Sequence, residues 1–294
     1  MRRTTYTSIR SGLEEVLALC RRLDLGAEVE ESRFVAYRHI LDGLIENLGN
    51  PGGAATVEHD PMRVGVALVE SVELADLIAY LVTVPPRILT PKLREVLRGP
   101  FLPVDEDQNS NQARNVMFEL TLACKLWRAG LAPELGEHPD LCCEIEARSL
   151  LIECKRAFSG RGIPGLIHRA GHQLRRHLTG ARAGCHGVVA LSVSRVMNEG
   201  DKVLAFSDER RASEELSRDV ERLAEEAAGA LRRVGPNQIV GAVFNMVTPA
   251  RQRGNGLIVR VDETVLAPLA TPGSAEDRAF RAFGEAMRST ADHR

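Results

Sequence analysis

The stretch that decides the fold is HPDLCCEIEARSLLIECKR, residues 138–156. Two short apolar runs, 140–145 and 150–158, are separated by a polar turn, and this pattern predicts two strands of a hairpin. Asp140 opens the first strand and Glu153 lies near the end of the second. The predicted hairpin therefore also carries candidate functional groups.

The register of the predicted hairpin follows from its side chains. Side chains alternate between the two faces of a strand, so Glu153 and Lys155 share one face. A register that pairs Asp140 with Glu153 also pairs Leu141 with Ile152 on the other face. The polar and apolar positions therefore agree on one antiparallel register.

Two carboxylates that lie opposite each other on a sheet repel, so we expect a group that offsets the repulsion of Asp140 and Glu153. Two carboxylates, a backbone carbonyl and waters suit Mg²⁺, which leaves a place for a phosphate oxygen. The Lys155 ammonium could orient or help deprotonate a metal-bound water and stabilise negative charge on phosphorus. The alternative is an ordinary exposed Glu–Lys pair on a strand.

A third carboxylate lies upstream, in the strongly amphipathic segment 112–128, which predicts a helix ending before Gly130. Glu119 lies on the buried side of this helix, beside Phe118 and Leu122. A carboxylate among apolar neighbours costs free energy unless it is paired or ligated. Glu119 is therefore a third candidate metal ligand, and a surface helix charge is the alternative.

The net charge of −2 hides an uneven distribution. Residues 154–198 contain no Asp or Glu and eight Lys or Arg, so this segment carries +8 and the rest of the chain carries −10. The helix expected to end at about Leu178 places several basic residues on one face, which fits contacts to phosphates, and a solvated face is the alternative. The expected nucleic-acid-binding residues are Arg156, Arg169, His172, Arg175 and Arg176.

The residues of this region resemble the PD-(D/E)xK nuclease superfamily, which has a restriction-endonuclease-like fold. The resemblance covers about residues 112–194, and its motifs are Pro139-Asp140 and Glu153-Cys154-Lys155. Glu119 matches the acidic residue of the first core helix of the family. The context of a helix, a hairpin and a basic helix makes these short motifs more specific than they are alone.

The resemblance implies a role for each matched residue. Asp140 and Glu153 would bind the metal ion, Mg²⁺ with Mn²⁺ as an alternative, together with the carbonyl of Cys154 and with help from Glu119. Lys155 would act on the attacking water. The side chain of Cys154 is expected on the apolar face of its strand, so we interpret its thiol as structural.

A further residue is implied by the helix that follows the second strand. Gln173 resembles the glutamine that many nucleases of this superfamily place beside the lysine, and His177 stands where an aromatic residue is common. The same helix carries His168 and His172 at the spacing of a zinc protease, but Arg169 occupies the position of the catalytic glutamate. We therefore reject a zinc protease site.

The residues before this region predict only helices, at about 8–25, 28–49, 63–82 and 93–97. The polar, turn-rich segment 103–112 follows them. We therefore place a domain boundary there, between an all-helical N-terminal domain, 1–104, and a nuclease-like domain, 105–294.

After the hairpin and its helix, the chain alternates strands and helices again. We expect a strand at 187–193, a helix at 208–234, strands at 238–247 and 257–261, and a last helix capped by Ser274. This order predicts an α/β fold with a mixed sheet flanked by helices.

Composition excludes other classes of protein. The six cysteines show no C-x-x-C spacing, which argues against disulfides and a structural zinc site. Apolar runs fall short of the roughly 20 residues of a membrane span, and the N-terminus lacks the apolar region of a signal peptide. We expect a cytoplasmic protein that is not associated with a membrane.

These observations lead to one hypothesis and one alternative. The hypothesis is a Mg²⁺-dependent nuclease that hydrolyses phosphodiester bonds in nucleic acid, with DNA as the expected substrate. Cutting both strands with one site per chain would favour a homodimer. The alternative is a catalytically inactive nucleic-acid-binding or assembly protein on a nuclease-like fold.

Overall fold

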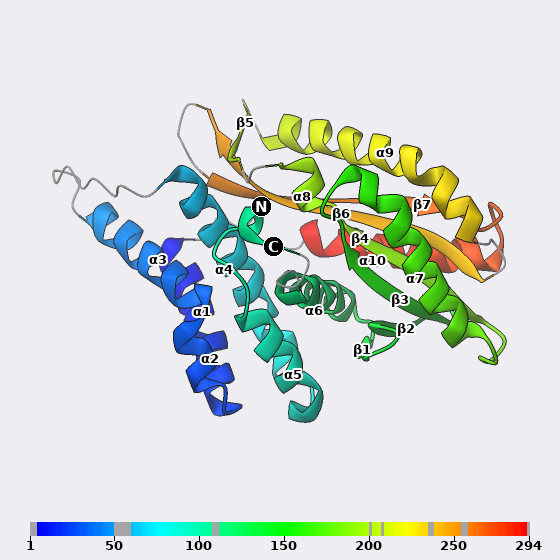
Figure 1. Cartoon of the computed structure of the whole chain (residues 1–294), viewed down its shortest axis with the longest axis horizontal. Coiled ribbons are helices and arrows are strands. Elements are labelled where there is room, and N and C mark those ends of the chain that lie inside the picture. The colour runs from blue at the N-terminus through cyan, green and yellow to red at the C-terminus, as the bar shows by residue number, and fades with distance from the viewer. Residues whose placement is uncertain are drawn as a thin grey trace.

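A mixed β-sheet with helices on both faces forms the larger part of the molecule, shown as a computed structural model in Figure 1. The structure describes residues 5–49, 60–107, 112–199, 202–206, 209–234, 238–253 and 258–292. Within these ranges the sheet has seven strands in the order β1-β2-β3-β4-β6-β5, and β7 also pairs with β6. The strands are β1 (Glu134–Leu135), β2 (Leu141–Ile145), β3 (Arg148–Arg156), β4 (Cys185–Ser192), β5 (Leu204–Phe206), β6 (Ile239–Gln252) and β7 (Ile258–Pro268).

Helices precede the sheet and cover both of its faces. They are α1 (Tyr6–Arg22), α2 (Gly26–Glu31), α3 (Arg33–Gly49), α4 (Pro61–Leu81), α5 (Pro86–Leu97), α6 (Gln112–Arg128), α7 (Ile163–Leu178), α8 (Ser194–Met197), α9 (Glu209–Val234) and α10 (Ala275–Asp292). Short 3₁₀ turns, η1 (Pro103–Asp105) and η2 (Gly160–Gly162), precede α6 and α7. Among the helices described, none is both long and apolar enough to cross a lipid bilayer.

The register predicted for the hairpin is confirmed. β2 and β3 are antiparallel, with Leu141 opposite Ile152 and Cys143 opposite Leu150. β3 then pairs in parallel with β4, and β4 with β6, so α7 and α9 serve as the crossover helices that parallel pairing requires. The predicted α/β class with a mixed, helix-flanked sheet is confirmed.

The two faces of the sheet bury separate hydrophobic clusters. Ile152 and Cys154 of β3 belong to a cluster that includes residues of α6 and α10, whereas α7 and α9 pack on the opposite face. Gly171 lets α7 approach α9 closely, because a side chain there would collide with Val234. The predicted cap of the last helix is confirmed, since the Asp277 N–H donates to Ser274 Oγ at 3.1 Å.

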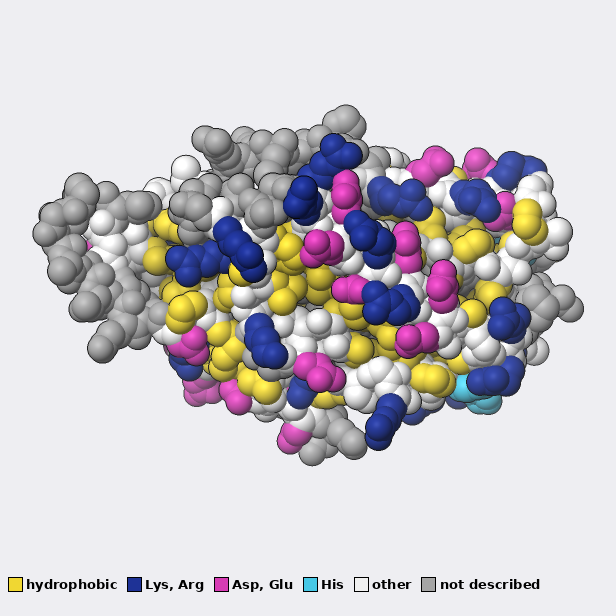
Figure 2. Space-filling model, turned by 90° about the horizontal axis from the view of Figure 1, so that it is seen from above, with side chains coloured by type: hydrophobic (Ala, Val, Ile, Leu, Met, Phe, Trp, Pro, Cys, Tyr) yellow, Lys and Arg dark blue, Asp and Glu magenta, His cyan; other side chains and the backbone are white. Residues whose placement is uncertain are grey.

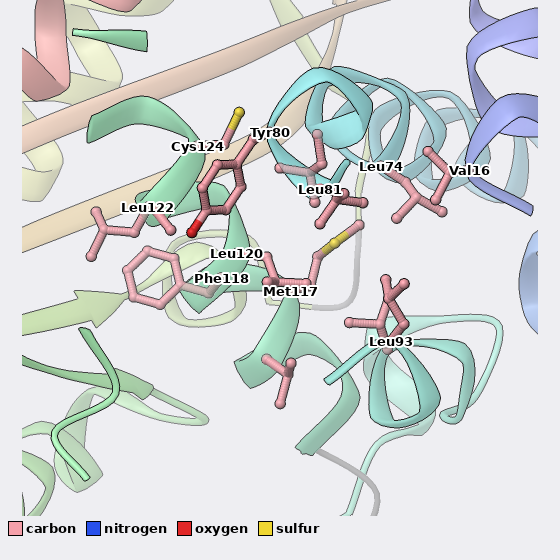
Figure 3. Packing of buried hydrophobic residues seen from close by; sticks show 14 of the residues in the cluster. Val16, Leu74, Tyr80, Leu81, Leu93, Met117, Phe118, Leu120, Leu122 and Cys124 are labelled. Atoms are coloured by element: carbon pink, nitrogen blue, oxygen red, sulfur yellow. The ribbon is translucent and has the colours of Figure 1, made fainter. Parts of the chain in front are cut away.

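The N-terminal helices share the first of these clusters with the sheet. Figure 3 shows Val16 of α1, Leu74 of α4, Leu93 of α5 and Met117 of α6 packed together, and the cluster continues to Ile152 of β3. The predicted boundary near residue 104 stays a prediction, and α6 is the element on which the two parts meet.

Several predicted elements differ in extent from the observed ones. The helix expected at 28–49 is divided into α2 and α3 at Ser32, whose backbone is extended and whose hydroxyl donates to the Val29 carbonyl at 2.7 Å. α5 begins at Pro86 instead of near Leu93, because a proline is favourable in the first turn of a helix. The helix stop expected at 50–53 lies outside the described residues.

The strands β6 and β7 are longer than predicted, and three short elements were not predicted at all. β6 continues to Gln252 and β7 to Pro268, because the two strands pair with each other over these residues. The extensions were not predicted because they contain Pro249 and acidic side chains, which interrupt the local strand pattern. β1, α8 and β5 have only two to four residues each, too few to show a period.

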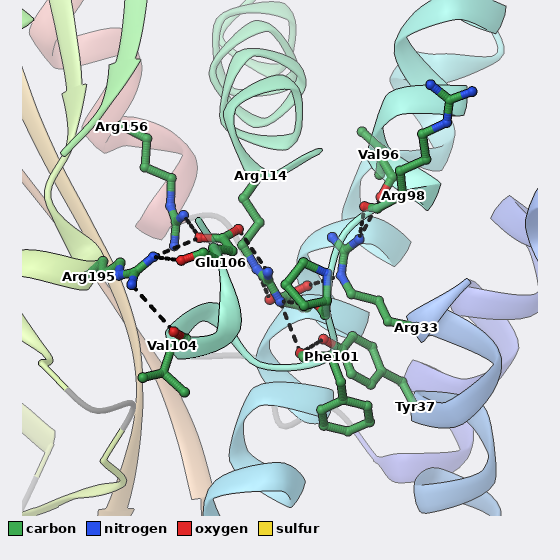
Figure 4. A network of polar contacts seen from close by, with 12 residues as sticks. Arg33, Tyr37, Val96, Arg98, Phe101, Val104, Glu106, Arg114, Arg156 and Arg195 are labelled. Atoms are coloured by element: carbon green, nitrogen blue, oxygen red, sulfur yellow. Dashed lines mark hydrogen bonds and ion pairs between the residues drawn. The ribbon is translucent and has the colours of Figure 1, made fainter. Parts of the chain in front are cut away.

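A buried charge network joins the N-terminal helices to the sheet (Figure 4). The fully buried carboxylate of Glu106 accepts from Arg114 Nη1 at 2.8 Å and from Arg156, and Arg195 Nη1 lies 3.5 Å away. Arg114 also donates to Glu70 of α4 at 2.6 Å. One carboxylate thus holds guanidinium groups from α6, β3 and α8 together.

We predict that Glu106→Ala lowers the free energy of unfolding by about 3–5 kcal/mol, because it leaves buried guanidinium groups without a counter-charge. Urea denaturation would measure this change. As a control, Glu214→Ala removes an exposed ion pair with Arg210 and should cost less than about 1 kcal/mol. Equal losses in both variants would contradict the stabilising role of the network.

Candidate metal centre and active site

The candidate site lies where β3 extends past the start of β2. Because Leu141 pairs with Ile152, the preceding Asp140 lies beside Glu153. Asp140 Oδ2 accepts a hydrogen bond from the Cys154 N–H at 2.7 Å. In a strand the N–H and C=O of one residue point to the same side, so the Cys154 carbonyl also points to the edge where Asp140 lies.

Lys155 lies close to both carboxylates that are predicted to share its site, Asp140 and Glu153. Its Nζ lies 3.0 Å from Glu153 Oε2 and 3.9 Å from Asp140 Oδ2. Glu153 is fully buried, while about a fifth of the Lys155 side chain is exposed. The structure therefore brings Asp140, Glu153 and Lys155 together, as predicted.

His138 adds a third group that could hold a metal ion. The ligand atoms of His138, Asp140 and Glu153 all lie within 4.8 Å of one another. The His138 ring is exposed and stacks on the ring of His177 on α7, with 6.2 Å between the two ring centroids. His138 was not predicted as a site residue from the sequence, and its position two residues before Asp140 was the available signal.

Burial and charge repulsion both act on Glu153. Burial, followed by the nearby Asp140 carboxylate, raises the pKa of Glu153, and the Lys155 ammonium opposes the rise. Among the described residues, Glu153 Oε1 is buried and has no hydrogen-bond partner. A buried carboxylate oxygen without a partner costs free energy, and a cation at this point would remove that cost. The residues present therefore fit a divalent ion.

Glu119 is buried on α6, as predicted, but it has a different partner. Its Oε2 lies 2.6 Å from the Nζ of Lys92, which comes from α5. Burial and the Asp140 carboxylate raise the pKa of Glu119 to about 7. The cluster of mutually close ligand atoms includes His138 and does not include Glu119. Lys92 could not be predicted as a partner of Glu119, because nothing in its local pattern indicates a contact 27 residues away.

Cys154 has a structural side chain, as expected. Its thiol is buried in the cluster on the α6 face, and burial raises its pKa well above the usual value. A thiol held in the neutral form is a poor nucleophile and a poor metal ligand. Only the backbone of Cys154 is available to the site.

Helix α7 lies against the site through one of its faces. Gln173 is half-buried and precedes His177 by one helical turn, so both lie on the same face of α7. Because the ring of His177 stacks on that of His138, this face is directed toward the candidate site. Gln173 therefore lies on the face of α7 that is directed toward the candidate site, and its role beside Lys155 stays a prediction.

Four of the five predicted nucleic-acid contacts are exposed on α7: Arg169, His172, Arg175 and Arg176. Arg175 also donates to the Val234 carbonyl at the end of α9, at 2.7 Å. No acidic residue occurs in α7, whereas basic and acidic side chains alternate over the face that α9 covers (Figure 2). A predominantly basic surface is therefore associated with α7 and not with α9.

The prediction that Arg156, the fifth of these residues, contacts nucleic acid is wrong. Side chains alternate along β3, so Arg156 points away from the face of Lys155 and toward the buried carboxylate of Glu106. Only 6% of Arg156 is exposed, and it cannot reach a nucleic acid. The charge of +8 in residues 154–198 thus overstates the basic surface, because Glu106 also lies beside Arg195.

No protein-family model, curated protein or solved structure matches this chain. The interpretation of the site therefore rests on its geometry and chemistry.

We predict that Mn²⁺ raises the melting temperature of the wild-type chain and that Asp140→Asn abolishes the shift. An ion at about 100 times its Kd should add about 2.7 kcal/mol of stability. The shift should become smaller as the pH falls, since the raised pKa of Glu153 lets protons compete with the ion at lower pH. Scanning fluorimetry with and without EDTA would measure it.

The matched control is Glu144→Gln, which neutralises an exposed carboxylate of β2 outside the cluster. It should leave the Mn²⁺ shift unchanged. A shift that persists in Asp140→Asn would place the ion elsewhere.

Proposed function

We propose that the chain is a metal-dependent nuclease that hydrolyses phosphodiester bonds, with DNA as its substrate. The observation that carries the proposal is the convergence of His138, Asp140, Glu153 and Lys155 at one end of β3. The order of α6, the β2–β3 hairpin, α7 and the parallel strand β4 is also the order that the resemblance to the restriction-endonuclease-like fold implies. This order supports the proposal and does not by itself indicate an activity.

The metal ion would be held by His138, Asp140 and Glu153, and the Cys154 carbonyl points to the same edge. The ion would supply a Lewis acid for a phosphate oxygen and lower the pKa of a bound water. Carboxylates suit Mg²⁺ and Mn²⁺, while imidazole is a better ligand for the later transition metals. Mn²⁺ is therefore the first ion to test, beside Mg²⁺.

Lys155 has two tasks in this proposal. Its ammonium lies 3.0 Å from Glu153 and is still partly exposed, so it can also reach a substrate phosphate. There it would orient the attacking water by donating a hydrogen bond to it, and it would stabilise negative charge on phosphorus. Gln173, on the face of α7 directed toward the site, would help to position the scissile phosphate.

DNA would lie along the exposed basic residues of α7, next to the site. Arginine and lysine contacts to phosphates give an affinity that depends on salt and little on sequence. Since the described residues of one chain form one such site, cleavage of both strands would need a homodimer or two successive nicks.

We predict that the wild-type chain nicks supercoiled plasmid in Mg²⁺ or Mn²⁺ and that EDTA stops the reaction. Asp140→Asn and Lys155→Ala should each lower the rate by at least about 100-fold, because each removes a group that acts on the reacting phosphate or water. Glu144→Gln is the matched control and should cut at the wild-type rate. Agarose gels over a series of protein concentrations would also separate single nicks from paired cuts.

Two outcomes would count against this proposal. Cleavage that survives both substitutions would exclude the site. Binding without cleavage in either metal ion would favour the alternative, a nucleic-acid-binding or assembly protein that keeps a nuclease-like fold without catalysis.

We also predict that Arg169→Ala and Arg176→Ala weaken DNA binding measured in EDTA by fluorescence anisotropy. Each substitution should lower the slope of log K against log salt concentration by about 1, because one phosphate contact is lost. Arg210→Ala removes an exposed arginine of α9 that is paired with Glu214, and it should change neither quantity. An equal effect at Arg210 would mean that binding follows total charge and not the α7 face.

A further inference from the structure

A row of polar side chains crosses the sheet at the point where β3 and β4 end. Arg156 of β3 pairs in register with Ser192 of β4, and Ser192 pairs with Asn245 of β6. The positions two residues earlier are apolar and belong to the hydrophobic cluster shared with α6: Cys154, Ala190 and Val243. In open α/β sheets, ligands bind beyond the carboxyl ends of parallel strands, and this row lies there.

The polar row forms one wall of a cavity of about 100 Å³. The other walls come from α4, from α6 and from residues 194–198, which contain α8. This volume exceeds what one water molecule needs, and it is well below the roughly 300 Å³ at which pockets for larger organic ligands begin. The cavity therefore suits a small ligand and is too small for a nucleotide.

The polar wall offers hydrogen-bond donors that the protein does not use. Arg156 is more than nine-tenths buried, and its Nη1 donates to the Glu106 carboxylate. Among the described residues, its Nε and Nη2 have no partner. The Ser192 hydroxyl has one long contact, 3.4 Å to the hydroxyl of Ser194, which accepts from the Val247 N–H at 2.9 Å. At least one of the two hydroxyl protons is therefore available to a ligand.

The guanidinium groups around the cavity outnumber the carboxylates that pair with them. Two carboxylates, those of Glu70 and Glu106, are in contact with four guanidinium groups, those of Arg33, Arg114, Arg156 and Arg195 (Figure 4). Burial lowers the pKa of Arg156, and the Glu106 carboxylate opposes this change. Buried positive charge without a counter-charge costs free energy, which a bound anion would offset. The cavity therefore favours an anion.

The cavity also contains one hydrogen-bond acceptor without a partner. Glu73 of α4 lines it and makes no hydrogen bond or ion pair with the described residues. The two oxygens of Glu70, by contrast, accept from Arg33 and Arg114. Burial raises the pKa of Glu73 to about 7, although the Arg260 guanidinium opposes the rise. An anion that also carries an O–H group would donate to this carboxylate.

We propose that this cavity binds one hydrogen phosphate ion, which accepts from Arg156 and Ser192 and donates its O–H to Glu73. Nε and Nη2 of an arginine form a parallel pair of N–H groups that matches two oxygens of a phosphate. The phosphate site is separate from the metal centre, because Arg156 and Lys155 lie on opposite faces of β3. It therefore gives the chain a second ligand, which does not depend on the proposed nuclease activity.

Isothermal titration of the full-length chain with inorganic phosphate at pH 8 tests the proposal. EDTA in the buffer keeps phosphate from binding through a metal ion, and sodium chloride holds the ionic strength constant. The wild type should bind one phosphate per chain. Sulfate has the same shape and charge but no O–H at this pH, so it should bind at least about 10-fold more weakly, because it leaves the Glu73 carboxylate unpaired.

Three variants test the residues of the proposed site. Ser192→Ala removes a donor without changing the charge, and it should weaken phosphate binding by about 10-fold. Arg156→Met should abolish binding, and circular dichroism confirms that each variant is folded. Glu73→Gln can donate through its amide, so it should bind sulfate and phosphate about equally. The matched control is Ser213→Ala, which removes a hydroxyl bonded to Glu263 on the opposite face of the sheet and should change neither affinity.

The outcomes that would overturn the proposal are distinct. Absence of phosphate binding by the wild type would mean that the cavity holds only water. Equal affinities of the wild type for phosphate and sulfate would exclude the hydrogen bond to Glu73. Binding that Ser192→Ala leaves unchanged would place the phosphate elsewhere, on the exposed basic residues of α7. Each of these results would leave the metal-dependent nuclease standing, since cleavage is measured separately.

Discussion

The hydrogen bond from the Cys154 N–H to the Asp140 carboxylate is the interaction on which the site depends. It forms because β2 and β3 pair in one antiparallel register, and a shift by one residue would move the apolar side chains of β3 to the polar face. The same register places Asp140 beside Glu153 and leaves β3 to extend past β2 toward α6 and α7. The apolar face of the hairpin already requires this register. The backbone therefore needs no further ordering to bring the two carboxylates together.

The free-energy cost of burying these carboxylates explains much of the surrounding structure. Buried carboxylates need counter-charges, and β3 meets this need differently on its two faces. On one face Lys155 lies beside Glu153, and on the other Arg156 reaches the buried Glu106. The network around Glu106 ties α6 and the N-terminal helices to the sheet, and α6 and α5 in turn carry Glu119 and Lys92. The stability of the core and the positions of the candidate site residues therefore depend on the same elements.

The hairpin, its register and the helix α6 could be predicted because each follows from a local pattern of apolar and polar residues. The burial of Arg156 could not be predicted, since it depends on Glu106, 50 residues earlier in the chain. Strand alternation alone places Arg156 and Lys155 on opposite faces, so it indicates that Arg156 does not share the surface of Lys155, but it does not indicate what Arg156 contacts. The contact of Lys92 with Glu119 was missed for the same reason, as no local period links α5 to α6. His138 differs from these two cases, because its position beside Asp140 was visible and only its role was overlooked.

Charge along a sequence is a weaker guide to a surface than the positions of the partners of each charge. Residues 154–198 lack acidic residues, yet Arg156 and Arg195 both lie beside Glu106, which belongs to a segment outside this range. The exposed basic groups that remain are concentrated on α7, which lies beside the candidate site through His177 and His138. On α9 the same types of side chain are interleaved with acidic ones and would attract a polyanion far less. A chain with a net charge of −2 can therefore still present one basic face. Here the acidic residue that lies beside Arg156 and Arg195 is the buried Glu106, and it does not neutralise the exposed basic side chains of α7.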